Sequence, residues 1–189
     1  MEVKKILKNV ATYLQLLDIS NVLDDLSKAT DEQTEEVNLL VSCVNYVSNL
    51  IATNYLKLYK TVKKFVSASY EITFENIDTE PILDIVSVKD MYGDKVPFSI
   101  TQSGVKTNYS GYVNITYSHF PAEVEFSGEI LEFKTKLNER IFAYGVASEY
   151  LFIKGNIDDS SMWDTRFKRE LLTLTRPGHS VKIPARKFV

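Results

Sequence analysis

The chain has 189 residues, of which 44% are hydrophobic and 12% aromatic, and its formal net charge is −3. These values predict one globular domain, or one domain with an inserted subdomain, and exclude a protein whose overall basic field recruits nucleic acid or anionic lipid. The single cysteine, Cys43, excludes an internal disulfide framework and a cysteine-based zinc cluster. The chain has neither a signal-peptide pattern nor a run of about 18 uncharged apolar residues. We therefore expect that the protein is made in the cytoplasm and does not associate with a membrane.

Residues 1–57 are predicted to be helical. Apolar residues in the stretch 3–17 recur at steps of three and four, which is the spacing of an amphipathic helix. Thr30 and Gln33 have the spacing of a capping box and predict the start of a second long helix. This helix is apolar over much of its circumference from residue 37 to residue 51, so we expect it to be buried on more than one side.

Charge is distributed unevenly along the chain. Seven acidic residues and one base, Lys28, lie between positions 18 and 36, whereas residues 176–189 contain four bases and no acid. The acidic residues are Asp18, Asp24, Asp25, Asp31, Glu32, Glu35 and Glu36. Two interpretations remain open: both segments are ordinary solvated surface, or one end of the molecule meets the other end of a neighbour.

An inserted β module is predicted for residues 58–134, because the apolar period changes there from 3.6 to 2. Residues 60–77 have the pattern of a hairpin, and residues 82–90, 95–100 and 112–118 have the pattern of further strands. Five or six short strands at this spacing predict a small antiparallel sandwich or barrel.

Helix is predicted again from about residue 136. Ala143, Gly145 and Ala147 form a run of small residues, and a glycine inside a helix costs about 1 kcal/mol relative to alanine. The simplest packing reason for this glycine is the close approach of another helix.

A last helix is predicted after Gly155, which has the position of a C-terminal helix stop, with Asp158 or Asp159 as the N-cap. Its expected core stripe consists of Trp163, Phe167, Leu171 and Leu174.

The order of elements predicts an α+β fold. We expect a helical bundle built from both chain ends, residues 1–57 and 135–176, with the β module between its halves and an extended tail at 177–189.

The sequence contains no pattern of catalytic or ligand-binding residues. His119 and His179 have no second ligand at metal-binding spacing, and there is no G-x-S-x-G, P-loop or G-x-G-x-x-G motif. We therefore expect no enzymatic activity, no metal and no cofactor. The tail HSVKIPARKFV combines cationic and apolar residues with one aromatic, Phe188, which favours docking on a protein partner over nucleic-acid binding.

Four segments carry a resemblance to a known family: LLVSCVNYVSNLIATNYL, DIVSVKDMYGDKVPF, ERIFAYGVASEYLFIKGNIDDSSMWDTRFKREL and IPARKF. In this order they resemble the head–tail adaptor (connector) proteins of tailed bacteriophages, the tail tubular protein A-like group. The resemblance implies a homo-oligomeric ring, commonly of twelve copies, in the virion neck beneath the portal protein. Such a ring extends the DNA channel without reading DNA sequence and offers a platform to a downstream neck or tail protein.

The resemblance also implies roles for individual residues. The portal-docking tail would comprise Ile183, Pro184, Arg186, Lys187 and Phe188, and the packed helical frame of the ring would comprise Ala143, Gly145, Ala147, Trp163 and Phe167. The acidic segment, represented by Asp24, Asp25, Asp31, Glu32, Glu35 and Glu36, would face the lumen or pair with a neighbour's basic end.

Two alternatives remain. One is another virion component, such as a tail-completion or decoration protein. The other is a soluble module whose β insert binds a carbohydrate or small ligand through Tyr109, Tyr112 and Tyr117.

Overall fold

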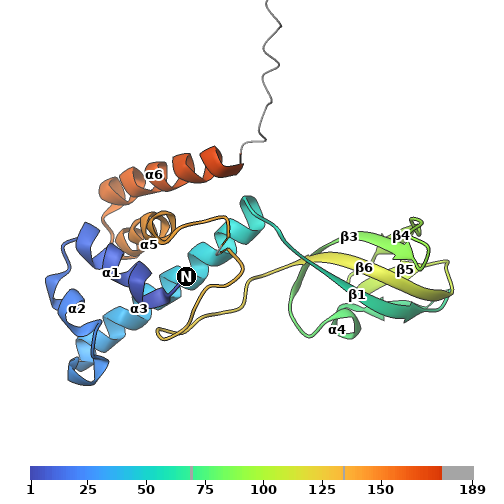
Figure 1. The fold of residues 1–189 in the computed structure, drawn as a ribbon, viewed down its shortest axis with the longest axis horizontal. Helices are drawn as coiled ribbons and strands as arrows, with labels where there is room; N and C mark the ends of the chain where they lie inside the picture. The colour runs from blue at the N-terminus through green and yellow to red at the C-terminus, as the bar shows by residue number, and fades with distance from the viewer. Residues whose placement is uncertain (69, 134, 176–189) are drawn as a thin grey trace, which may run out of the picture.

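The structure is a computed structural model and describes residues 1–68, 70–133 and 135–175. It confirms the predicted α+β class (Figure 1). The predicted docking tail, with Ile183, Pro184, Arg186, Lys187 and Phe188, lies outside the described residues.

The elements follow the predicted order of helices, strands and helices. The helices are α1 (Val3–Tyr13), α2 (Leu17–Val22), the 3₁₀ turn η1 (Leu26–Lys28), α3 (Asp31–Asn54), α4 (Phe74–Ile77), α5 (Glu139–Ile153) and α6 (Ile157–Thr175). The strands are β1 (Leu58–Val66), β2 (Glu71–Thr73), β3 (Ile82–Asp90), β4 (Phe98–Ile100), β5 (Gly104–Thr107) and β6 (Gly111–His119).

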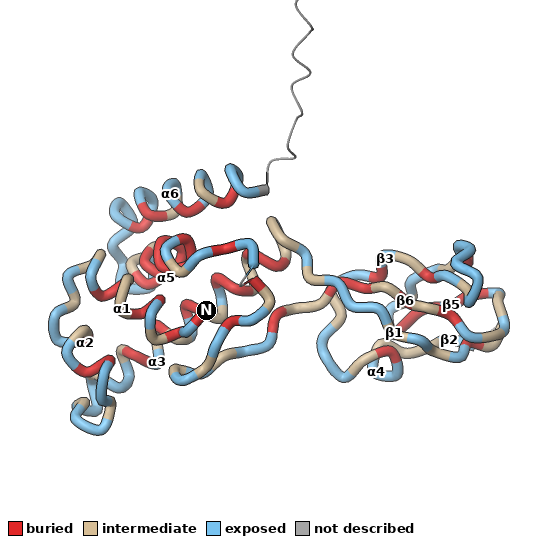
Figure 2. Tube along the Cα trace, viewed as in Figure 1, coloured by how far each residue is buried: buried red, intermediate tan, exposed pale blue. Residues whose placement is uncertain are grey.

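The molecule has two lobes with separate hydrophobic cores. The helical lobe contains α1, α2, α3, α5 and α6, and the β lobe contains the six strands and α4. Figure 1 shows the β lobe projecting from one end of the helical lobe, and Figure 2 shows buried residues in the interior of each lobe. No core residue of one lobe belongs to the core of the other, so the two lobes bury their apolar surfaces independently.

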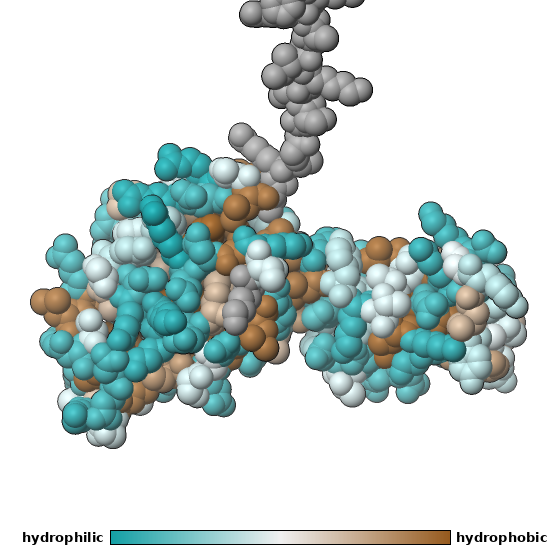
Figure 3. Space-filling model, in the orientation of Figure 1, coloured by the Kyte–Doolittle hydropathy of each residue, from teal (hydrophilic) through white to brown (hydrophobic). Residues whose placement is uncertain are grey.

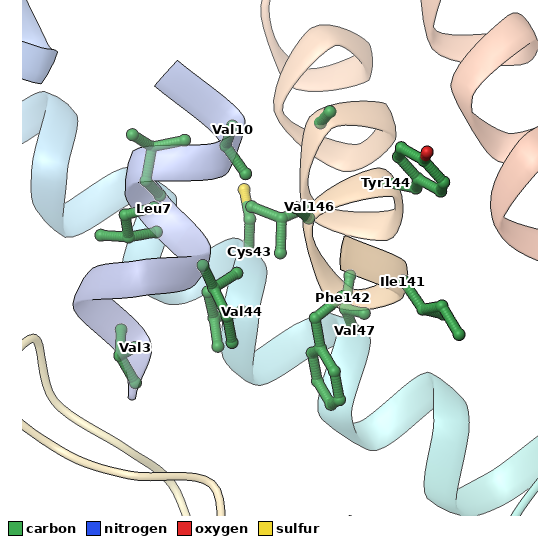
Figure 4. Packing of buried hydrophobic residues seen from close by; sticks show 14 of the residues in the cluster. Val3, Leu7, Val10, Cys43, Val44, Val47, Ile141, Phe142, Tyr144 and Val146 are labelled. Atoms are coloured by element: carbon green, nitrogen blue, oxygen red, sulfur yellow. The ribbon is translucent and has the colours of Figure 1, made fainter. Parts of the chain in front are cut away.

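Helix α5 lies at the centre of the helical lobe, with α1, α3 and α6 packed around it. Figure 4 shows Cys43 of α3 between α1 and α5, close to Val10 and Val146. Burial raises the pKa of the Cys43 thiol to about 12, so this cysteine is an inert core residue.

Local signals fixed the boundaries of two helices. The Thr30 hydroxyl accepts a hydrogen bond from the Gln33 amide at 3.2 Å, and the Gln33 side chain accepts one from the Thr30 amide at 2.9 Å, which confirms the capping box of α3. Gly155 follows α5 with φ +81°, the left-handed conformation that favours glycine at a helix end.

The prediction for the N-cap of α6 was wrong by two or three residues. Asn156 caps this helix and accepts a hydrogen bond from the Asp159 amide, while Asp158 and Asp159 lie in the first turn, where carboxylates interact well with the helix dipole. The expected core stripe also ends early: Leu171 is fully buried, but Leu174 is half exposed near the end of the described helix.

The β lobe consists of two three-stranded antiparallel sheets, with the strand orders β1-β6-β3 and β2-β5-β4. Val113, Ile115 and Tyr117 of the central strand β6 point into the core between the sheets, as their alternation predicts. The predicted hairpin at residues 60–77 was wrong. Strand β1 pairs with β6 along its whole length and β2 pairs with β5, because alternation defines which face is buried but not which strand is the partner.

The segment from residue 120 to residue 133 returns to the helical lobe. Ile130 and Phe133 are buried in the helical core, although the predicted module extended to residue 134. The Val3 amide donates to the Gly128 carbonyl, and the Asn45 side chain exchanges two hydrogen bonds with the Val124 backbone. The strands of the insert therefore end at His119, and the following segment belongs to the helical lobe.

Candidate interaction surfaces

The small residues of α5 mark a close contact between helices in the helical lobe. A Cβ atom built on Gly145 would lie 2.9 Å from Phe167 of α6 and 2.9 Å from Val47 of α3. The sequence predicted this close approach. Together with Ala143, Ala147, Trp163 and Phe167, Gly145 is buried inside the chain. These five residues therefore hold the helices of the chain together, and they lie in its interior, away from its surface.

An aromatic cluster joins α1, α5 and α6. The rings of Tyr13, Tyr144 and Trp163 lie 5.4–5.6 Å apart, and the Arg166 guanidinium lies 4.9 Å from the centroid of the Trp163 ring. Arg140 donates a hydrogen bond to the Tyr144 hydroxyl. The cluster brings together residues 150 positions apart, and sequence reasoning identified only Trp163 because pairing between distant rings leaves no local signal.

An open groove of about 530 Å³ lies where the α1–α2 turn meets the first turns of α3. We call it the acidic groove. Its lining residues are Gln15, Leu16, Leu17, Asp18, Ile19, Glu32, Gln33 and Glu36. The Gln33 side-chain nitrogen donates to the Asp18 carbonyl at 3.4 Å, so the capping residue of α3 also ties the two walls together.

The groove carries three carboxylates and no basic side chain in its lining. Glu36 forms an ion pair with Lys154 at 2.7 Å and accepts a hydrogen bond from the Tyr150 hydroxyl. Burial alone would raise the pKa of Glu36, but these two partners outweigh it and the pKa is lowered. Glu36 is therefore a structural carboxylate that joins α3 to α5, while Asp18 and Glu32 are exposed and form no ion pair with another described residue.

The remaining acids of the predicted acidic segment fall into two groups. Asp24 bonds Lys4 and Lys8 of α1 at 3.0 and 2.7 Å, and Asp25 bonds Lys28 at 3.0 Å. Asp31 and Glu35 are exposed on α3, without an ion pair among the described residues. The segment thus provides both internal ion pairs and a free acidic surface beside the groove.

The acidic groove and the turn from α5 into α6 are two of the places where the helical lobe exposes apolar side chains. Leu17, in the acidic groove, is 73% exposed. Phe152, Ile153 and Ile157 are at least half exposed where α5 turns into α6, and we call these three residues the α5–α6 corner. Figure 3 shows apolar residues scattered among polar ones over the helical lobe on the side in view. Exposed apolar residues grouped in this way are typical of contact surfaces between proteins.

A polar cluster closes one side of the β lobe. Asp78 follows α4 and pairs with Lys60 of β1 at 2.6 Å, and it also accepts a hydrogen bond from the hydroxyl of the buried Tyr117. The bond from Lys60, followed by that from Tyr117, lowers the pKa of Asp78. The same contacts raise the pKa of Lys60 to about 12, while burial and then Asp78 raise that of Tyr117 to about 12. Since all polar atoms have partners, the cluster is explained by its structural role.

Of the three tyrosines suggested for ligand stacking on the β lobe, the structure buries one and half-buries another. Tyr117 is fully buried and Tyr109 packs partly against the core, so only Tyr112 of the three suggested tyrosines is exposed. The ring centroids of Tyr112 and Phe65 lie 5.3 Å apart in an edge-on arrangement. The Lys63 ammonium lies 4.9 Å from the centroid of the Tyr112 ring.

In the part of the chain that the structure describes, no group of three His, Cys, Asp or Glu side chains is arranged so that it could hold a metal ion. None of its helices is both long and apolar enough to cross a membrane. Comparison with models of known protein families and with curated protein sequences finds no match to this chain. Function therefore has to be argued from the surfaces described above.

Proposed function

We propose that the protein is a structural head–tail adaptor of a tailed bacteriophage, which assembles into a ring beneath the portal. The observation that carries this proposal is the helical lobe. Its core is complete within one chain, yet it still exposes the apolar α5–α6 corner and the apolar, acidic groove. Exposed apolar surfaces of this kind are typical of a protein that functions by assembly with other proteins.

A ring needs two different, mutually complementary surfaces on each subunit, because its contacts are head-to-tail. The groove and the C-terminal end of α6 satisfy this geometry. Helix α2 lies at the end of the helical lobe that is remote from the β lobe, and α6 ends near the junction with the β lobe (Figure 1). Two such remote ends favour a heterologous contact over a two-fold one.

The two lobes have separate roles in this proposal. The helical lobe forms the ring body, whose lumen lets DNA pass without sequence-specific binding, and the β lobe projects from it toward a downstream neck or tail protein. Residues 177–189 bind the portal through Ile183, Pro184, Arg186, Lys187 and Phe188.

The test uses the cognate portal protein with two forms of the chain, full-length and ending at Gly178. Native mass spectrometry and negative-stain microscopy report stoichiometry and position. We expect the full-length protein to form a ring on one face of the portal, with twelve copies as the family resemblance implies. We expect the truncated protein not to bind the portal. A chain with Ala at Glu123 and Glu125, two exposed acids of the helical lobe, serves as a control and should bind as the full-length protein does. A full-length protein that stays monomeric and leaves the portal bare contradicts the proposal.

A second candidate is a ligand-binding module that uses the exposed Phe65 and Tyr112 pair of the β lobe. A glycan array probed with the full-length protein and with Tyr112→Ala tests it. Glycan binding that is lost in the variant would support this function. If the protein instead has another structural role in the virion, it should occupy a different position in the virus particle.

A further inference from the structure

We infer that the acidic groove binds the basic tail, residues 176–189, of a second copy of the chain when no portal is present. This inference goes beyond the proposed portal contact and does not depend on it, because it concerns the free protein.

Charge is the first argument for this occupant. Asp18 and Glu32 face the groove without an ion pair to a described residue, and the exposed Asp31 and Glu35 lie one and three residues from Glu32 on α3. The tail carries four bases and no acid: Arg176, Lys182, Arg186 and Lys187. Complementary charge of this kind steers association and orients the docked segment.

Hydropathy is the second argument. Leu16, Leu17 and Ile19 give the groove an apolar side, and Leu17 leaves 73% of its surface exposed. The tail places Ile183 and Phe188 among its bases, so each of its apolar residues has a cation within three positions. The groove volume of about 530 Å³ is in the range of about 300–1,000 Å³ that is usual for sites holding a small ligand or a few side chains.

The wall of the groove is held in place before any partner arrives. Glu36 is anchored to Lys154 at 2.7 Å and to Tyr150, and Gln33 connects α3 to the Asp18 backbone. A preformed site loses less conformational freedom on binding than a flexible one.

The position of the C-terminal end of α6 favours binding of the tail to the groove of a second copy over binding to the groove of the same chain. Helix α6 leads into the tail at the end of the helical lobe that faces the β lobe, whereas α2 and the groove lie at the opposite end (Figure 1). Docking between two molecules therefore joins opposite ends head-to-tail, the same sense of contact that closes a ring.

The test uses two variants of the full chain. The groove variant carries Asp18→Lys and Glu32→Lys, and the tail variant carries Arg186→Glu and Lys187→Glu. A control with Glu123→Lys and Glu125→Lys makes the same change in net charge as the groove variant at two exposed acids outside the groove. Sedimentation velocity over a range of protein concentrations, at low and high salt, measures self-association without portal, and circular dichroism confirms that each variant is folded.

We expect the wild-type protein and the control to self-associate at low salt and to do so less at high salt, because screening weakens contacts between exposed charges. The groove and tail variants should each self-associate on the order of tenfold or more weakly. Mixing these two variants should restore a one-to-one dimer, because the tail variant keeps an intact groove and the groove variant keeps an intact tail. Leu17→Ala, which removes an exposed apolar group, should weaken association at both salt concentrations.

Three outcomes would overturn the inference: a wild-type protein that is monomeric at every concentration, association that persists unchanged in the groove variant, or no dimer in the mixture. If the wild-type protein is monomeric and chemical cross-linking joins its tail to its own groove, the occupant is the tail of the same chain. Since portal is absent throughout, none of these results bears on the portal-binding test, so the two proposals fail separately.

Discussion

Gly145 shows how a single residue specifies the packing of the helical lobe. With no side chain, it allows Phe167 of α6 and Val47 of α3 to approach the same turn of α5 from two sides. Alanine favours the helix by about 1 kcal/mol, but its methyl group would lie 2.9 Å from both neighbours. Because Phe167 and Val47 are themselves buried, neither can move away without disturbing its own contacts.

We therefore expect Gly145→Ala to lower the free energy of unfolding by about 1–2 kcal/mol, the cost of overpacking less the gain in helix propensity. Urea unfolding followed by circular dichroism measures it. Ser161→Ala, at an exposed position of α6, is the matched control and should change stability little. A stabilised Gly145→Ala protein would show that α3 and α6 do not approach α5 this closely.

Asp78 is the residue through which the β lobe should respond to acid. Its pKa is lowered first by the hydrogen bond from Lys60 and then by that from Tyr117. In the unfolded chain the Asp78 carboxyl group has a pKa of about 4. As the pH falls, it therefore binds a proton more readily in the unfolded chain than in the folded one. The stability that Asp78 contributes is complete above pH 4 and is lost as the pH falls toward its folded-state pKa.

Asp78→Asn should accordingly destabilise the protein at pH 7, and the difference from wild type should shrink as the pH falls below about 4. Urea unfolding at several pH values between 7 and 2 measures this difference. Asp84→Asn, at an exposed position of β3, is a suitable control. If the difference in unfolding free energy between the wild-type protein and Asp78→Asn stays constant across this range, the assigned contacts of Asp78 are contradicted.

At the scale of elements, α3 is the helix whose start is best defined by its own sequence. The reciprocal hydrogen bonds of Thr30 and Gln33 satisfy two amides at its first turn, and Gln33 also reaches the Asp18 carbonyl of the neighbouring wall. The cap therefore has a local role in starting the helix and a tertiary role in forming the acidic groove.

Thr30→Ala should lower the free energy of unfolding by about 1 kcal/mol, the usual cost of losing an N-cap side chain. Thr34→Ala, one turn later and exposed, loses no cap and should be close to neutral. Thermal unfolding of the two variants compares them directly. Equal losses in both would indicate that the capping box contributes nothing specific.

At the scale of the whole molecule, the two lobes are joined where the first and last strands of the insert meet. Leu58 of β1 and His119 of β6 are paired in register, so the chain leaves the helical lobe and returns to it at neighbouring points. Their Cα atoms are therefore about 4.5–5.5 Å apart, the spacing of an antiparallel pair. The helical core draws no buried residue from the strands between them.

Replacing residues 59–118 by two glycines should therefore leave a helical lobe that folds on its own, because a two-residue turn spans an antiparallel pair. We expect the helical circular dichroism signal per helical residue to be retained and a single cooperative thermal transition to remain. Loss of helix in this deletion would show that the helical lobe needs the β lobe to fold.

The sequence by itself determined the features that depend on neighbours along the chain. The change of apolar period from 3.6 to 2 and back predicted the α+β class and the order of elements. The pattern at Thr30 and Gln33 predicted the start of α3, Gly155 predicted the end of α5, and Gly145 predicted a close helix contact. Each of these signals acts within about one helical turn, where sequence spacing translates directly into geometry.

Only the tertiary structure decided which distant segments meet. Strand β1 pairs with β6 and not with β2, and Ile130 and Phe133 join the helical core. Glu36 of α3 bonds Lys154, the residue after α5, across 118 positions. The acidic groove likewise depends on the α1–α2 turn lying against α3. The physical reason is that alternation and amphipathicity specify which face of an element is buried, whereas the partner of that face is chosen by packing among all the buried faces at once.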